Sequence, residues 1–269
     1  MDQPLRHYAL FGNPVGHSLS PLMHNAAFGA LGFRALYEVH CVEDLELSVR
    51  LIREKPLAGV SVTLPVKGAI MAFLDEVDED ACTIGAVNTI TNKDGRLRGS
   101  NTDWIGLMAA MREQFCLKGK TVAVLGAGGA ARAAIYGILQ EGGIPIVFNR
   151  SRDRGESLAR WFECDAMPLA NLGRVEADVL VNTTPVGMSP LTEETPVHQR
   201  YLPRWQWVVD TIYNPLETRL LREAKAAGCG VVTGLSMFVR QGAEQIRIWT
   251  GLEPQVELMS RVVMTALEK

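Results

Sequence analysis

The sequence predicts an α/β protein with a largely parallel sheet. Apolar runs of strand length alternate with segments of helical period from one end of the chain to the other. The apolar runs are continuous rather than alternating, which is typical of strands that are covered by helices on both faces. The sequence pattern changes at Lys118, after which an expected strand, a glycine-rich turn and a long expected helix follow one another. At 269 residues, the chain is long enough for two modest domains or one large one.

Strands and helices are expected in alternation along the first part of the chain. Ser20 and Pro21 indicate a helix start, with Ser20 as N-cap and Pro21 at the first helical position. The turn Lys93-Asp94-Gly95 carries the Asp-Gly signal of a β-hairpin. Strands are expected at 8–11, 36–42, 59–64, 86–91 and 96–99, and helices from 20, from 45, around 68–74 and at 104–115.

The part after Lys118 continues the same alternation. Strands are expected at 121–125, 144–148, 178–182, 208–213 and 231–233, and helices at 130–140, 156–162, 217–227, 237–249 and 255–267. The pattern indicates domain boundaries near 103–119 and near Gly234.

Composition excludes several classes of protein. The net charge is −3, which argues against a nucleic-acid binder, because such proteins need a basic excess or stripe. No apolar run of about 18 residues is present, so we expect no membrane span. The segment 1–12 has no basic region followed by a long apolar segment, so we expect no signal peptide. The cysteines are odd in number and scattered, which indicates neither a metal cage nor a disulfide framework and fits a reducing cytoplasm. They are Cys41, Cys82, Cys116, Cys164 and Cys229.

A glycine-rich turn follows the strand expected at 121–125. It fits the pattern G-x-G-x-x-[GA] and consists of Gly126, Ala127, Gly128, Gly129, Ala130 and Ala131. Glycine lets the backbone approach a pyrophosphate, and a helix N-terminus offers free N–H groups and partial positive charge. A strand before the turn and a helix after it are the context that this motif requires. We therefore expect a dinucleotide cofactor; a closely packed turn without a ligand is the alternative.

The tip of the next expected strand indicates which dinucleotide binds. An NAD site has an acidic residue there, which bonds the ribose 2′-hydroxyl. This chain instead has Asn149-Arg150-Ser151 followed by Arg152 and Arg154, and arginine binds a 2′-phosphate through charge-assisted hydrogen bonds. The sequence therefore predicts NADP rather than NAD. A solvated basic turn is the alternative, and Asp153 follows the strand tip too late to bond the ribose.

Further short segments join the glycine turn in a fixed order from about Tyr8 to the last helix. They are Gly12-Asn13-Pro14, Ser18-Leu19-Ser20-Pro21, the run 61–67 (SVTLPVK), the run 85–89 (GAVNT), Asn101-Thr102-Asp103, the run 182–188 (NTTPVGM), the run 210–215 (DTIYNP) and Gly234-Leu235-Ser236-Met237. Together they resemble the shikimate dehydrogenase family. The chain departs from the family at Ser61, where asparagine is common.

The resemblance implies a fold, an activity and a location. A substrate domain at 1–103, completed by the helices at 237–269, would surround a Rossmann NADP domain at 104–236. The activity would be the reversible NADPH-dependent reduction of 3-dehydroshikimate to shikimate, a step of chorismate and aromatic amino acid biosynthesis. The protein would be a cytoplasmic monomer or homodimer that binds a small-molecule substrate and no metal.

By resemblance, Lys67 and Asp103 form the catalytic pair. An ammonium group near the ketone can stabilise developing negative charge and donate a proton, and a nearby carboxylate can orient it. Taken alone, Lys67 could be a surface lysine and Asp103 a helix N-cap before Trp104. Which of the two residues carries the proton stays open.

The resemblance also assigns the binding residues. Ser18 and Ser20 would hold the substrate carboxylate together with Tyr213, and ring hydroxyls would bond to Ser61, Thr63, Asn88 and Gln241. Thr183, Pro185, Met188, Gly234 and Met237 would line the nicotinamide side of the cofactor site. His17 and His24 receive no role and are interpreted as structural.

Two other functions stay open at this point. A sister enzyme would use quinate or another cyclic hydroxy acid, or would prefer NAD. A catalytically inactive NADP-binding regulator could share the scaffold, although retention of both Lys67 and Asp103 argues against it.

Overall fold

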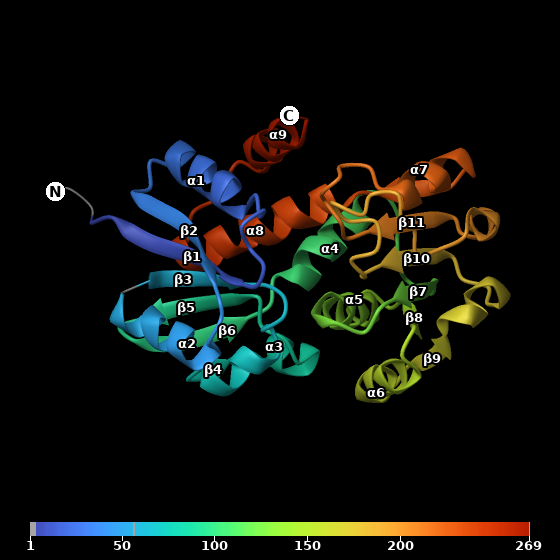
Figure 1. The fold of residues 1–269 in the computed structure, drawn as a ribbon, viewed down its shortest axis with the longest axis horizontal. Coiled ribbons are helices and arrows are strands. Elements are labelled where there is room, and N and C mark those ends of the chain that lie inside the picture. Colours follow the sequence, from blue (N-terminus) through green and yellow to red (C-terminus); the bar gives the residue numbers. More distant parts are fainter. Residues whose placement is uncertain (1–3, 56, 269) are drawn as a thin grey trace. The chain divides into compact units, whose positions relative to one another are not determined.

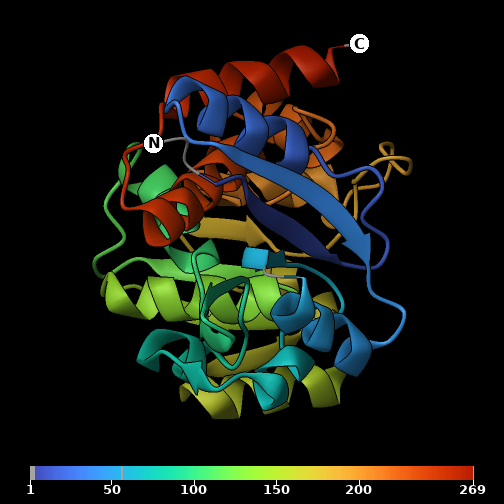
Figure 2. The same ribbon diagram turned by 90° about the vertical axis from the view of Figure 1, so that its left-hand side faces the viewer.

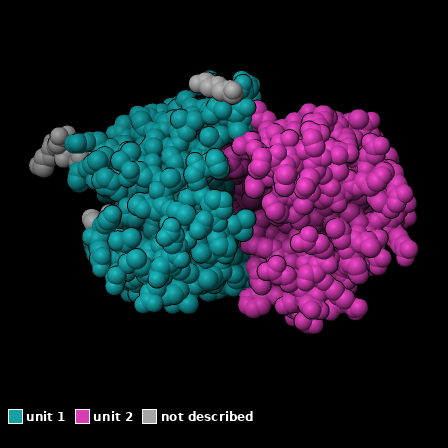
Figure 3. Space-filling model, in the orientation of Figure 1, with its two compact units in different colours: residues 1–102, 241–269 teal, residues 103–240 magenta. Residues whose placement is uncertain are grey.

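The computed structural model describes residues 4–55 and 57–268. It divides into two compact units, which Figure 3 colours separately. The first unit comprises Met1–Thr102 with Gln241–Lys269, and the second comprises Asp103–Arg240. Each unit contains one six-stranded sheet. The predicted α/β class is therefore confirmed, although the strands form two sheets, of which one is only partly parallel.

The sheet of the first unit combines parallel strands with a hairpin. Its order is β2-β1-β3-β5-β6-β4, with β1 parallel to both β2 and β3. β5 runs antiparallel to β3 and β6, and the turn between β5 and β6 places Asp94 and Gly95 at φ of 53° and 85°. The Asp-Gly hairpin is thus confirmed. The strands are β1 Arg6–Gly12, β2 Ala35–Cys41, β3 Leu57–Val62, β4 Glu76–Val77, β5 Thr89–Lys93 and β6 Arg96–Ser100.

Helices cover both faces of this sheet (Figures 1 and 2). One face carries α2 Leu45–Glu54, the 3₁₀ helix η1 Ala69–Phe73 and α3 Glu79–Ile84, and the other carries α1 Ser20–Ala30, α9 Val256–Leu267 and the second half of α8 Gly234–Thr250. On this second face the ring of Tyr8 lies 5.0 Å from that of Phe28 and 4.9 Å from that of Trp249. A Cβ atom at Gly59 would lie 2.4 Å from the indole of Trp249, so glycine allows α8 to pack closely on β3.

The sheet of the second unit is entirely parallel. Its order is β12-β11-β10-β7-β8-β9, so the direction of winding reverses between β7 and β10. In doubly wound folds a dinucleotide binds at this reversal, outside the carboxyl ends of the strands. The strands are β7 Thr121–Leu125, β8 Ile144–Asn149, β9 Asp165–Pro168, β10 Val179–Asn182, β11 Trp207–Asp210 and β12 Gly230–Val232. The helices are α4 Asp103–Arg112, α5 Gly129–Gln140, α6 Arg152–Phe162, α7 Arg219–Ala226, and the 3₁₀ helices η2 Leu169–Arg174 and η3 Gln199–Arg204.

The central strand β7 is buried on both faces. Ala123 and Leu125 belong to an apolar cluster with residues of α7, including Leu220. Because side chains alternate along a strand, Val122 and Val124, which are fully buried, point to the opposite face. These contacts explain why β7 is continuously apolar, and they hold its carboxyl end, where the glycine turn begins, in a fixed position.

Some predicted element boundaries are wrong. Ser20 is the first residue of α1 rather than its N-cap, which is Leu19, and no side chain caps this helix. The helix expected at 68–74 is the 3₁₀ helix η1, and the helix expected at 237–249 begins earlier, at Gly234. The short elements β4, α3 and β9 were not expected.

Candidate functional site

The glycine turn has the geometry of a phosphate-binding loop. Gly126 adopts a φ of +112°, and a Cβ atom there would lie 2.7 Å from the hydroxyl of Thr183, which follows β10. Its N–H donates to the carbonyl of Phe148 in β8 at 2.9 Å. Gly128 is the N-cap of α5 and provides no side-chain cap, so the N–H groups at the start of this helix stay available to an anion. These residues fit the pyrophosphate of a dinucleotide.

The tip of β8 presents arginines to solvent. Asn149 donates through Nδ2 to the carbonyl of Ser151 at 2.8 Å, which fixes the turn into α6. Arg152 is paired with Glu156 at 2.6 Å. Arg150 and Arg154 are exposed, and neither forms a hydrogen bond or ion pair with any residue that the structure describes. These two guanidinium groups fit the 2′-phosphate of NADP.

A buried polar pair shapes the loop after β10. Asn182 and Asp210 are the last residues of β10 and β11, and Nδ2 of Asn182 donates to Asp210 at 3.1 Å. The amide oxygen Oδ1 of Asn182 accepts from the N–H of Thr184 at 3.0 Å. Asp210 also accepts from Thr218 at 2.7 Å, and burial raises the pKa of Asp210 to about 6. Sequence reasoning gave this pair no role, although a polar residue at the end of two buried apolar strands is a usable signal.

The residues expected near the nicotinamide follow two strands of the second unit, in a loop after β10 and in the helix after β12. Thr183, Pro185 and Met188 follow β10, and Gly234 and Met237 follow β12 in the first turns of α8. A Cβ atom at Gly234 would lie 2.2 Å from the carbonyl oxygen of Ile212, so only glycine lets α8 begin this close to the segment after β11.

In the first unit, the loops after β1 and β3 are bound to each other. The N–H of Thr63 donates to the carbonyl of Phe11 at 2.8 Å, and that of Asn13 donates to Leu64 at 3.0 Å. A Cβ atom at Gly12 would lie 2.4 Å from the methyl group of Thr63. The expected substrate loop and Thr63 therefore lie at the same edge of the sheet.

Ser18 and Ser20 are adjacent at the N-terminus of α1. The hydroxyl of Ser18 donates to that of Ser20 at 3.1 Å and accepts from the N–H of Ser20 at 3.2 Å. The helix provides no side-chain cap of its own, so its N–H groups and the two hydroxyls together favour an anion such as a carboxylate.

Asn88 and Gln241 are brought together although they are far apart in the chain. Nδ2 of Asn88 lies 3.5 Å from Oε1 of Gln241, and Oδ1 of Asn88 accepts from the N–H of Thr102 at 2.7 Å. Ser61 lies in β3, where it is cross-strand partner of Thr89. Four of the expected substrate residues, Ser61, Thr63, Asn88 and Gln241, thus belong to one unit.

The roles of Lys67, Asp103 and Tyr213 stay predictions. Lys67 is half-buried, and its carbonyl accepts from the N–H of Val87 at 2.8 Å. Asp103 is 5% exposed and opens α4 in the second unit. The ring of Tyr213 stacks on that of Phe238 at 4.0 Å.

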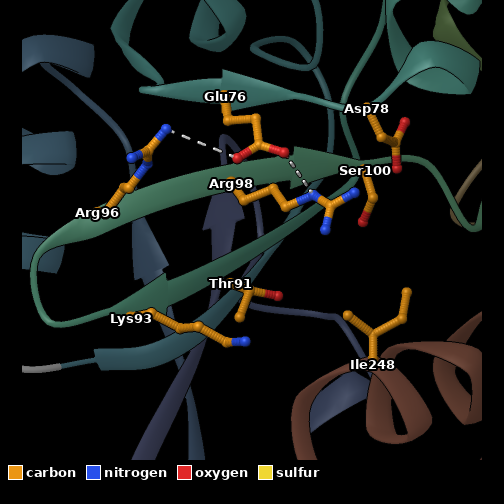
Figure 4. Close-up of a pocket in the computed structure, with 8 residues that line it drawn as sticks. All are labelled: Glu76, Asp78, Thr91, Lys93, Arg96, Arg98, Ser100 and Ile248. Carbon is orange, nitrogen blue, oxygen red and sulfur yellow. Dashed lines mark ion pairs between the residues drawn. The ribbon is translucent and has the colours of Figure 1, made fainter.

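A separate cavity of about 350 Å³ lies on the outer part of the first sheet (Figure 4). None of the predicted site residues lines it. Glu76 forms ion pairs with Arg98 at 3.3 Å and with Arg96 at 3.9 Å, so acidic and basic side chains offset one another there. Its lining residues are Glu76, Asp78, Thr91, Lys93, Arg96, Arg98, Ser100 and Ile248.

Comparisons with known proteins identify the family. A family model described as "Shikimate dehydrogenase substrate binding domain" matches residues 10–90, and one described as "Shikimate 5'-dehydrogenase C-terminal domain" matches residues 234–264. A curated "Shikimate dehydrogenase (NADP(+))" from Pyrococcus abyssi is 43% identical over 97% of this chain and 98% of its own length. The chain belongs to the shikimate dehydrogenase family. The family predicted from the sequence motifs is therefore confirmed.

Two further members of the shikimate dehydrogenase family support this assignment. A "Shikimate dehydrogenase (NADP(+))" from Geobacillus kaustophilus is 44% identical over 97% of this chain and 99% of its own length. The crystal structure of a shikimate 5-dehydrogenase from Thermus thermophilus, in complex with NADP(H) and shikimate, has a TM-score of 0.91 and 41% identity. That comparison covers 98% of this chain and all of the other (100%).

The parts of this chain that the structure describes contain no helix long and apolar enough to cross a membrane.

Proposed function

We propose that this chain catalyses the reversible NADPH-dependent reduction of 3-dehydroshikimate to shikimate. The observation that carries this proposal is the match, over nearly the whole of both chains, to an enzyme whose crystal structure holds NADP(H) and shikimate together. The strand reversal beside the glycine turn and the exposed arginines of the β8 tip are consistent with that cofactor.

Bound NADPH supplies the hydride. Lys67 donates a proton to the carbonyl oxygen of the substrate and stabilises the negative charge that develops there. Asp103 orients the ammonium group of Lys67 and shares its proton. In the reverse direction the same pair accepts the proton from the hydroxyl of shikimate. No other chemistry is required of the protein besides binding and orientation.

The substrate is held through its carboxylate and its ring hydroxyls. Ser18 and Ser20 bind the carboxylate at the N-terminus of α1, with the hydroxyl of Tyr213 as a further donor. Thr63, Asn88, Gln241 and Ser61 bond the ring hydroxyls. Amide side chains suit this task because they both donate and accept hydrogen bonds.

The cofactor is held at the carboxyl ends of the second sheet. Gly126, Ala127, Gly128, Gly129 and Ala130 receive the pyrophosphate. The 2′-phosphate is bound by Asn149, Arg150, Ser151 and Arg154, while Thr183, Pro185, Met188, Gly234 and Met237 surround the nicotinamide.

Replacing Arg150 by aspartate is expected to weaken NADP far more than NAD. Loss of one charge-assisted hydrogen bond costs about 2 kcal/mol, and the new carboxylate repels the 2′-phosphate but can bond a 2′-hydroxyl. Dissociation constants for both nucleotides, measured by titration, check this selectivity. Arg152→Asp is the matched control, because Arg152 is already engaged by Glu156. An equal loss for NADP and NAD in Arg150→Asp would exclude Arg150 from 2′-phosphate recognition.

Replacing Ser18 by alanine is expected to raise KM for shikimate with a smaller change in kcat. One hydrogen bond to a carboxylate is lost, which corresponds to roughly tenfold in binding, whereas the reacting carbon is not touched. Steady-state kinetics with NADP at saturation measure both constants. An unchanged KM would mean that the carboxylate is bound elsewhere.

One assay tests the proposed function against its two alternatives. The purified protein is mixed with shikimate or quinate, each with NADP or NAD, and nicotinamide absorbance is followed. We expect the highest kcat/KM for shikimate with NADP. Faster turnover of quinate, or preference for NAD, would favour the sister enzyme. Tight NADP binding without turnover of any pair would favour an inactive regulator.

The proposal extends to the partners, cellular location and oligomeric state of the enzyme. The small net negative charge argues against nucleic-acid partners, and the scattered cysteines fit the cytoplasm. We expect a monomer or a homodimer, which light scattering of the purified protein would distinguish.

A further inference from the structure

A buried hydrogen-bond chain lies behind the residues expected to bond the ring hydroxyls. Ser61 of β3 accepts from the hydroxyl of Tyr37 at 2.6 Å and donates to Oε1 of Gln245 at 2.7 Å. Nε2 of Gln245, which lies in α8, donates to the carbonyl of Asn88 at 3.1 Å and to the hydroxyl of Thr89 at 3.0 Å. All of these residues belong to the first unit.

The direction of every bond in this chain follows from one carbonyl group. The carbonyl of Asn88 can only accept, so the NH₂ group of Gln245 must face it and its oxygen must face Ser61. That oxygen can only accept, so Ser61 must donate to it. A hydroxyl has a single proton, so Tyr37 must be the donor in its bond to Ser61. Ser61 therefore offers a ligand a lone pair and no proton.

Asn88 offers the opposite polarity beside it. Its Oδ1 accepts from the N–H of Thr102 and from the hydroxyl of Thr89, each at 2.7 Å. Its donor group, Nδ2, donates to the hydroxyl of Thr102 at 3.0 Å and lies 3.5 Å from Oε1 of Gln241. Since Ser61 pairs across the sheet with Thr89, the acceptor and the donor are neighbours.

We propose that Gln245 is a positioning residue that fixes Ser61 as a hydrogen-bond acceptor only and so makes this site select a ring hydroxyl that donates. This inference rests on the proposed function, because shikimate supplies the hydroxyl. Ser61 keeps 5% of its surface exposed and Gln245 only 1%, so Gln245 acts through Ser61 rather than on the substrate.

The test uses shikimate and two analogues, in each of which one of the ring hydroxyls remote from the reacting carbon is replaced by fluorine. Fluorine cannot donate, so the unchanged protein is expected to bind one analogue at least about fivefold more weakly than shikimate, the value of one neutral hydrogen bond. In Gln245→Met the proton of Ser61 is released and can point to the fluorine. The ratio of the two dissociation constants is then expected to fall by about fivefold, towards one.

Tyr37→Phe is the matched control. It removes one hydrogen bond from the same buried chain but leaves Ser61 donating to Gln245, so the ratio should not change. An unchanged ratio in Gln245→Met, or an equal fall in Tyr37→Phe, would overturn the inference. Ser61→Ala decides the matter if Gln245→Met does not fold, because loss of the acceptor must also bring the ratio towards one.

The same measurements separate this inference from the proposed function. If the unchanged protein neither binds nor turns over shikimate, the proposed function fails and the inference fails with it. If shikimate is turned over but the ratio in Gln245→Met equals that of the unchanged protein, only the inference fails.

Discussion

Replacing Lys67 by methionine is expected to lower kcat by roughly 10²–10⁴-fold, the usual contribution of a positioned proton donor. Methionine is unbranched and apolar like the stem of lysine, although one atom shorter, and it has neither the charge nor the proton of lysine. The carbonyl of Lys67 that accepts from Val87 is backbone and stays in place, so the local fold should persist. Turnover of shikimate with NADP, followed by absorbance at saturating concentrations of both, measures the effect.

Two controls make the Lys67 result specific. The dissociation constant of NADP should change little, because the nucleotide residues lie in the second unit. Lys120→Met removes a lysine that bonds Gln206 at 3.0 Å, and its kcat should be unchanged. A Lys67→Met enzyme that retains more than about a tenth of normal turnover would remove Lys67 from the proton-transfer step.

The fold was predictable wherever a short pattern fixes the local structure. Continuous apolar runs identified β7 and β8, and the Asp94-Gly95 turn identified the hairpin, because these patterns depend on burial and on φ alone. The short strand Glu76–Val77 carries neither signal. It forms by pairing with β6, a contact between segments that the sequence does not show to be neighbours.

The site was predictable through its motifs and not through its supporting contacts. The glycine turn is recognisable in the sequence because Gly126 adopts a positive φ close to Thr183, a position that requires glycine. Gln245 carries no such signal: a glutamine four residues after Gln241 in a helix is ordinary in sequence. Its role arises from bonds to Ser61 of β3 and to Asn88, the residue before β5. Contacts of this kind, between distant segments, need the folded structure.

The buried histidine His24 is expected to make the stability of the protein depend on pH. It is fully buried in α1, its Nδ1 donates to the carbonyl of Ser20 at 2.9 Å, and its ring stacks on Tyr37 at 4.2 Å. The rings of Phe28 and Trp249 lie further around it. The carbonyl of Ser20 and the side chain of Gln245 favour the protonated ring, but burial among these uncharged neighbours outweighs them. Burial lowers the pKa of His24 from 6.5 to about 4.

Whether stability rises or falls with pH depends on which state, folded or unfolded, binds the proton of His24 first as the pH falls. As pH falls below 6.5, the unfolded chain protonates His24 while the folded protein does not, so this residue's contribution to stability is lost between pH 6.5 and about 4. Above pH 6.5 the contribution is fully present. At about 1.4 kcal/mol per pH unit, the loss amounts to about 3 kcal/mol. Asp210 acts in the opposite sense, because its raised pKa of about 6 lets the folded protein take up its proton first.

Because Asp210 is present in both, comparing the pH dependence of stability in the unchanged protein and in His24→Asn isolates the contribution of His24. His24→Asn keeps a donor for the carbonyl of Ser20 but cannot titrate. The free energy of unfolding, measured with urea between about pH 7 and about pH 4, should fall by about 3 kcal/mol more in the unchanged protein than in His24→Asn. His17→Asn, at an exposed histidine, should leave the profile unaltered. If the unchanged protein and His24→Asn lose stability in parallel as the pH falls, His24 is already protonated in the folded state, and the neutral environment inferred for it is wrong.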